Sequence, residues 1–108
     1  NALGFMYEEG RGVPQNFAKA SALYLKAMKG GDAVAMTNRG LMILNGKGAK
    51  KDPQQAYMHF LLSAAYARDD AARDEANKLK EEVAATLTEP QISRGQTMAD
   101  KFAKQEIK

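Results

Sequence analysis

The chain has 108 residues, of which 44% are hydrophobic and 27% are charged, and this balance is typical of one folded globular domain. It contains no cysteine and one histidine, which excludes a disulfide scaffold, a cysteine nucleophile and a multi-histidine metal site. The net charge of +3 is too small to argue for nucleic acid as a partner. No apolar run approaches the roughly 18 residues of a membrane span, so we expect no membrane insertion.

The first feature along the chain is a pattern of glycines that recurs at an offset of 36 residues. The segments 4–12 and 40–48 each hold three glycines and a methionine in the same register: Gly4, Gly10 and Gly12 in the first segment, and Gly40, Gly46 and Gly48 in the second. Farther along, Ala20 aligns with Ala56. We therefore expect two structural repeats.

Each glycine of the pattern has an expected structural role. The first lies inside a helical pattern, where glycine is costly unless a neighbouring helix must approach closely. The second is expected to close its helix in the left-handed conformation. The third is expected to let the following loop turn tightly. Asn16 and Asp52 come next and are good N-caps for a second helix.

The pattern predicts helices in the order first helix, glycine loop, second helix. The expected ranges are about 1–9 and 17–29 in the first repeat, about 33–45 and 53–68 in the second, and then 69–86 and a last helix that ends near 106. Gly30-Gly31 breaks the chain before Asp32, which can cap the next helix. Thr88 begins a capping box for the last helix.

The glycine signature is lost from residue 69, and the charges over residues 73–108 are dense and balanced. A helical array needs such a polar end. The predicted fold is therefore all-α: a single α-solenoid domain over 1–108 made of two helix-turn-helix repeats and a two-helix C-terminal cap. Repeat one covers about 1–35, repeat two about 36–71 and the capping helices about 72–108. Two repeats are few for a solenoid and the chain starts at Asn1, so we interpret it as a fragment of a longer protein.

The segment 2–16, Ala-Leu-Gly-Phe-Met-Tyr-Glu-Glu-Gly-Arg-Gly-Val-Pro-Gln-Asn, resembles the signature of the Sel-one-like repeat family. This family is related to the tetratricopeptide repeat, and the segment 24–32 is similar to the second half of its pattern. The second repeat departs from the pattern, because Arg39 stands where Leu3 stands in the first and Ile43 replaces the tyrosine.

The resemblance implies a right-handed superhelical stack whose concave face binds other proteins. Members of the family are mostly adaptors or scaffolds. Many are bacterial, in exported or envelope-associated regulators, which favours the envelope, the periplasm or secretion and leaves the cytoplasm open. We therefore expect a non-catalytic protein-interaction module that binds a protein or peptide, with self-association also possible.

Two alternatives to this interpretation remain. Some cysteine-rich proteins with similar repeats act on cell-wall or β-lactam substrates, but this chain lacks cysteine, and none of its three serines has a lysine three places on. The second alternative is a purely structural spacer. We predict no catalytic, metal or cofactor-binding residue, and we interpret His59 as a partly buried packing residue or a surface residue.

The candidate contacts for a partner lie on the first helices of the repeats. They are Tyr7, Asn38, Arg39, Met42 and Asn45. Asn38 can hydrogen-bond an extended peptide backbone. Two placements stay open for Arg39: its side chain extends to solvent, or it faces the groove and pairs with a partner carboxylate.

Overall fold

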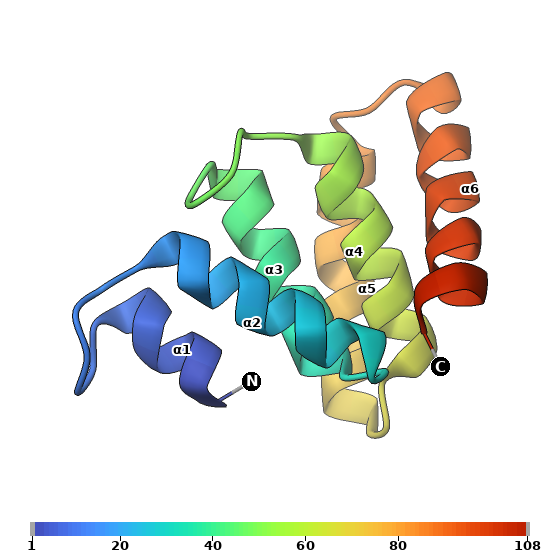
Figure 1. Ribbon diagram of the computed structural model, residues 1–108. Helices are drawn as coiled ribbons and strands as arrows, with labels where there is room; N and C mark the ends of the chain where they lie inside the picture. Colours follow the sequence, from blue (N-terminus) through green and yellow to red (C-terminus); the bar gives the residue numbers. More distant parts are fainter. Residues whose placement is uncertain (1, 108) are drawn as a thin grey trace.

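Six helices make up the protein in the computed structural model, which describes residues 2–107, with side chains from Leu3 onward (Figure 1). They are α1 (Ala2–Glu9), α2 (Phe17–Lys29), α3 (Ala33–Asn45), α4 (Pro53–Tyr66), α5 (Asp70–Ala84) and α6 (Glu89–Glu106). The predicted bounds of α2 and α3 are confirmed, whereas α4 ends two residues early. The expected start of the first helix at residue 1 lies outside the described residues.

Side-chain caps determine where five of these helices begin. In each case the side-chain oxygen of the residue before the helix accepts a hydrogen bond from a backbone N–H in the first turn. The caps are Asn16, Asp32, Asp52, Asp69 and Thr88, and Thr88 forms the predicted capping box with Gln91. Each cap satisfies a donor that the helix itself leaves free.

Glycine allows the two helices of a repeat to approach each other closely. A Cβ atom on Gly40 would lie 2.7 Å from Cε1 of Phe60, and one on Gly4 would lie 2.8 Å from Cε1 of Tyr24. Gly46 ends α3 with a left-handed φ of 71°. The other loop glycines of the pattern, Gly10, Gly12 and Gly48, also have positive φ. The roles expected for the repeated glycines are therefore confirmed.

Helices that follow each other from α1 to α5 pack side by side, and the chain forms an α-solenoid of helical repeats. We call α1 and α2 repeat one, and α3 and α4 repeat two. In Figure 1, α2 and α4 lie in front of α3 and α5. The main core is formed chiefly by α2, α3 and α4 and includes Tyr24, Met28 and Met36. Ala20 and Ala56 are fully buried at equivalent positions of α2 and α4.

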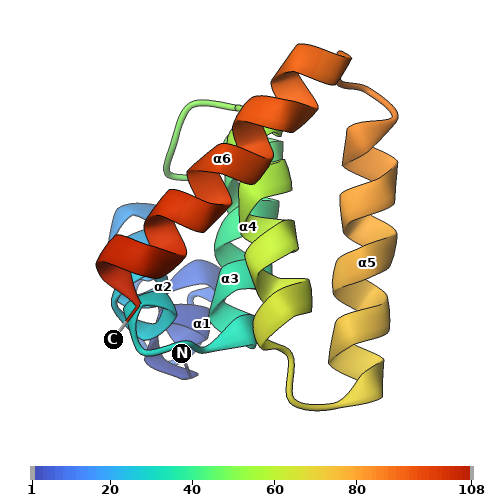
Figure 2. The same ribbon diagram turned by 90° about the vertical axis from the view of Figure 1, so that its right-hand side faces the viewer.

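The two C-terminal helices do not form a third closely packed pair. Both α5 and α6 pack mainly on α4. Figure 2 shows α6 crossing α4, while α5 lies on the other side of α4, apart from α6. The second half of α6 reaches the main core through Ala99 and Phe102. Gly95 makes the crossing close, because a Cβ atom there would lie 2.6 Å from Cδ2 of Tyr57. The cap therefore covers both sides of repeat two.

Candidate functional site

The accessible face of α3 carries a single stripe of uncharged side chains. Val34, Asn38, Leu41 and Asn45 follow each other at intervals of four, three and four residues, which places them on one side of the helix. Val34 is 50% exposed, although it is a large apolar residue. Asn38 and Leu41 are half-buried and Asn45 is exposed. The stripe thus offers both apolar and hydrogen-bonding groups.

A hollow opens between this stripe and α5. It has a volume of about 90 Å³, and we call it the α3–α5 trough. Its lining residues are Ala33, Val34, Thr37 and Asn38 of α3, Ser63 of α4, and Ala72 and Glu75 of α5. Asn38 and Glu75 therefore line the same small space from opposite helices.

Two hydroxyl groups in the lining of the trough are held by hydrogen bonds. Ser63 Oγ donates to the backbone oxygen of Ala33 at 2.9 Å. Since this bond uses the only proton of that hydroxyl, Thr37 Oγ1 must donate to Ser63 Oγ, at 2.6 Å. Both residues are buried. This hydroxyl pair ties α3 to α4 directly beneath the trough.

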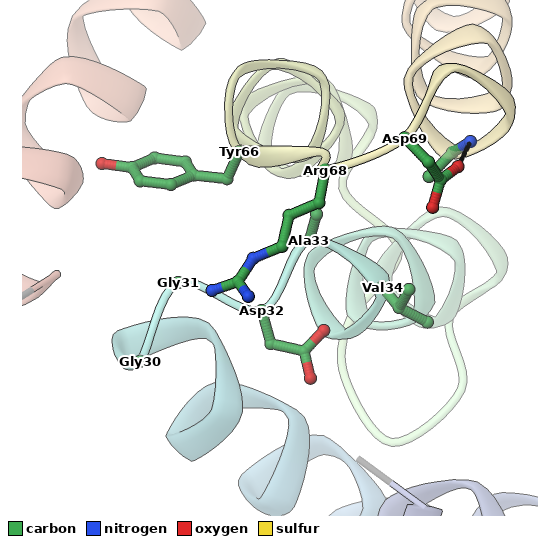
Figure 3. A pocket seen from close by; sticks show the side chains of 9 residues that line it. Gly30, Gly31, Asp32, Ala33, Val34, Tyr66, Arg68 and Asp69 are labelled. Atoms are coloured by element: carbon green, nitrogen blue, oxygen red, sulfur yellow. Dashed lines mark hydrogen bonds between the residues drawn. The ribbon is translucent and has the colours of Figure 1, made fainter.

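The trough continues into a larger pocket of about 400 Å³ at the N-terminal ends of α3 and α5 (Figure 3). Both hollows are lined by Ala33, Val34 and Ala72. Figure 3 shows Arg68 extending across the pocket toward Gly31 and Asp32. Asp32 and Asp69 each use one carboxylate oxygen as a helix cap. The face as a whole is therefore polar, with small side chains between its charged groups.

Three of the five predicted contact residues lie elsewhere. Met42 is only 2% exposed and belongs to the main core, where the Met42 side chain cannot reach a partner. Tyr7 is half-buried, and Lys19 Nζ lies 5.3 Å above its ring. Arg39 is half-buried, and its guanidinium donates to Ser21 and His59 of the neighbouring helices. Only Asn38 and Asn45 share the accessible face of α3.

His59 is fully buried, so the expectation of a partly buried or surface residue is wrong. Its Nε2 lies 2.8 Å from Arg39 Nη1, and its Nδ1 lies 2.7 Å from the Gln55 backbone oxygen. Burial lowers the pKa of His59 to about 4; the Arg39 charge also lowers it, and the Gln55 hydrogen bond acts against the shift. Both ring nitrogens are occupied, which leaves no free base at this position.

Tyr24 supplies a second buried polar link, this time within repeat one. Its hydroxyl donates to Glu8 Oε1 at 2.8 Å. Burial raises the pKa of Tyr24, and the Glu8 carboxylate raises it further, while hydrogen bonding with the Asn38 side chain lowers it. The hydroxyl therefore stays protonated and remains a donor at neutral pH.

Of the residues that line the trough, only Asn38 was among the predicted contacts, and the missed residues include Val34 and Glu75. Val34 could have been found, because it lies four residues before Asn38 and therefore on the same face of the helix. No comparable signal exists for Glu75, which is 37 residues from Asn38 in the chain. Only the packing of α5 on α4 brings it to the trough.

Within residues 2–107, no group of three or more histidine, aspartate or glutamate side chains is arranged to hold a metal ion. None of the helices over the same range is both long and apolar enough to cross a membrane. A further hollow of about 450 Å³ lies between α4 and α6 and contains none of the predicted contact residues.

Comparisons with curated proteins and with solved structures find no match to this chain. A family model does match: the Sel1 repeat, twice, over residues 1–32 and 33–65. These two matches cover more than half of the sequence and agree with the two helix pairs α1–α2 and α3–α4. The chain therefore belongs to the Sel1 repeat family.

Proposed function

We propose that this protein is a non-catalytic interaction module that binds an extended segment of a partner protein in the α3–α5 trough. Sel1 repeats are generally protein-interaction modules. The observation that carries the proposal is that Asn38, which is half-buried, lines the trough next to an exposed apolar residue, Val34. This combination suits a peptide backbone together with one apolar side chain.

The chemistry of Asn38 supports an extended partner. A carboxamide can donate to a backbone carbonyl and accept from a backbone N–H at the same time. An extended peptide presents both groups to one side, and its alternate side chains then select for sequence. Val34 offers apolar surface for one such side chain, and Glu75 on the opposite wall favours a hydrogen-bond donor. The trough thus matches the mixed character of a peptide better than that of an apolar ligand.

The buried polar groups do not support catalysis. His59 is inaccessible and uses both ring nitrogens, and Ser63 donates its proton to the Ala33 carbonyl. A nucleophile needs a base within hydrogen-bond reach and an open path for the substrate. Neither Ser63 nor His59 has that environment, which agrees with the generally non-catalytic character of the family.

Site-specific photo-crosslinking in a lysate of the source cell tests the proposal. The crosslinking residue p-benzoylphenylalanine replaces Val34 at the rim of the trough, or Lys101, which is exposed on α6, as the matched control. We expect a discrete adduct from position 34 and none from position 101. The substitution Asn38→Ala in the same background should reduce the adduct about fivefold, since a lost hydrogen bond is worth about 1 kcal/mol.

Three outcomes would contradict the proposal. Equal adducts at both positions would indicate non-specific association. An adduct at position 34 that is unchanged by Asn38→Ala would place the partner on another part of the face. The absence of any adduct would favour the spacer interpretation.

A further inference from the structure

One half-buried side chain bridges the two repeats. Arg39 of α3 donates from Nε to Ser21 Oγ of α2 at 3.2 Å, and from Nη1 to His59 Nε2 of α4 at 2.8 Å. Since α2 belongs to repeat one and α3 and α4 belong to repeat two, this guanidinium joins the repeats. Burial lowers the pKa of Arg39, but an arginine keeps its charge at any ordinary pH.

The hydrogen bonds determine the protonation state of His59. The Gln55 backbone oxygen can only accept, so His59 Nδ1 must carry a proton. The Arg39 guanidinium can only donate, so His59 Nε2 must be unprotonated. The structure therefore contains the neutral imidazole with its proton on Nδ1.

Proton uptake by His59 is incompatible with this arrangement. A protonated Nε2 would face Arg39 Nη1, so that two donors and two positive charges would meet in a buried place. Arg39 is the charged group that acts on His59 through its charge. Ser21, the neighbour from α2, and Gln55, the hydrogen-bond partner from α4, are both uncharged. No carboxylate among these neighbours can offset the new charge.

We propose that His59 makes the joint between the repeats sensitive to protons, so that protonation at Nε2 expels the Arg39 guanidinium and releases α2 from α3. The Ser21 hydrogen bond is lost together with the His59 hydrogen bond, because both come from the same guanidinium. Repeat two remains tied by other contacts, among them the Thr37–Ser63 pair between α3 and α4. The release is therefore local to the boundary between the repeats.

The direction and range of the effect follow from linkage. The pKa of His59 is about 4 in the closed protein and 6.5 for a free histidine. Because the closed state has the lower pKa, the joint is fully closed above pH 6.5 and weakens as the pH falls toward 4. Between pH 7 and pH 5 the equilibrium constant for opening should rise about twenty-fold.

The chain itself offers a matched control. At the positions that correspond to Arg39 and His59 at the offset of 36 residues, repeat one has Leu3 and Leu23. The double variant Arg39→Leu/His59→Leu therefore gives repeat two the apolar pair of repeat one and removes both the guanidinium and the titratable imidazole. Should this variant fail to fold, His59→Gln serves instead, because its side-chain oxygen can accept from Arg39 but does not titrate.

Amide hydrogen exchange at pH 7 and pH 5, corrected for the intrinsic effect of pH on exchange, tests the proposal. In the unmodified chain we expect the opening constant of α2 amides to rise about twenty-fold at pH 5, while amides in the middle of α4 change much less. The control variant should show no such rise. Equal behaviour of the two proteins, or a uniform rise over all helices, would overturn the proposal.

A second measurement isolates the histidine. The chain has one histidine, so its imidazole signals in an NMR titration are unambiguous. We expect them to titrate well below pH 6. Titration near pH 6.5 with α2 and α3 still protected would overturn the proposal, because it would mean that the joint tolerates a charged His59.

Discussion

Repeat one and repeat two have the same helix pair but different chemistry beside its closest contact. In both, a glycine of the first helix lies against an aromatic ring of the second: Gly4 against Tyr24, and Gly40 against Phe60. Next to that contact, repeat one has Leu3 on its first helix, whereas repeat two has Arg39. The comparison teaches that the glycine–aromatic contact defines the repeat. The residue before the glycine can be polar, provided that its hydrogen-bond donors find acceptors.

The equivalent faces of the two first helices also differ in exposure. Leu3 and Met6 of α1 are 48% and 36% exposed, whereas Met42, the equivalent of Met6, is buried. The reason is that α2 covers this face of α3 and joins the same core cluster as Met42. A position in the repeat therefore predicts a side chain's direction, but its burial depends on the helix that packs against it.

The largest expected difference between the repeats concerns the last glycine of each loop. Gly12 and Gly48 both have positive φ, so alanine is strained at either position by about 1 kcal/mol. At Gly48 the new Cβ would also lie 2.8 Å from Phe17 Cβ and 2.9 Å from its backbone oxygen, whereas at Gly12 it would meet only the flexible end of Met6. We expect Gly48→Ala to cost about 3 kcal/mol and Gly12→Ala about 1 kcal/mol.

Urea unfolding followed by circular dichroism at 222 nm measures both variants. Equal losses for Gly12→Ala and Gly48→Ala would mean that the second loop can move away from α2 without cost. The two loops would then differ in sequence but not in how much their last glycine contributes to stability.

The Arg39–His59 pair should give the next largest effect. At pH 7.5, Arg39→Leu leaves a buried acceptor on His59, and His59→Leu leaves Arg39 without one of its acceptors. We expect each single substitution to lower the free energy of unfolding by about 2 kcal/mol. The double variant should cost less than the sum by at least about 1 kcal/mol, because neither orphaned group remains.

A double-mutant cycle with the same unfolding assay checks this prediction. Strict additivity would show that the two side chains do not act as a pair. In that case repeat two would tolerate leucine at each position independently, as repeat one does at Leu3 and Leu23.

The smallest expected effect comes from making repeat one more like repeat two. Tyr24→Phe removes the hydroxyl that donates to Glu8 and leaves a phenylalanine, the residue that repeat two has at Phe60. We expect a loss of about 1 kcal/mol and a fall in Tm of about 5 °C. Differential scanning calorimetry gives both values, with Tyr66→Phe, a half-buried tyrosine, as the control. If the Tyr66→Phe control loses as much stability as Tyr24→Phe, the hydrogen bond from Tyr24 to Glu8 contributes nothing to stability.

The order and bounds of the helices could be predicted because local residues determine them. Asn16, Asp32 and Asp52 cap helices through hydrogen bonds that reach only three residues along the chain. Gly46 ends α3 through its own backbone conformation. Such signals depend on nothing distant, so the repeat pattern was sufficient for the helix pairs and for the solenoid fold.

The candidate site was only partly predictable, since it depends on contacts between distant residues. Of the predicted contact residues, Asn38 and Asn45 lie on the accessible face of α3, whereas Glu75, which was not predicted, reaches the trough only through the packing of α5. Arg39 could not be placed because its partners, Ser21 and His59, lie 18 and 20 residues away on two other helices. The sequence by itself determined the repeats, the caps and the glycine contacts, because these are local or recur at a fixed spacing. Only the tertiary structure decided which polar side chains are buried together, because hydrogen bonding and burial depend on the neighbours that the packed helices supply.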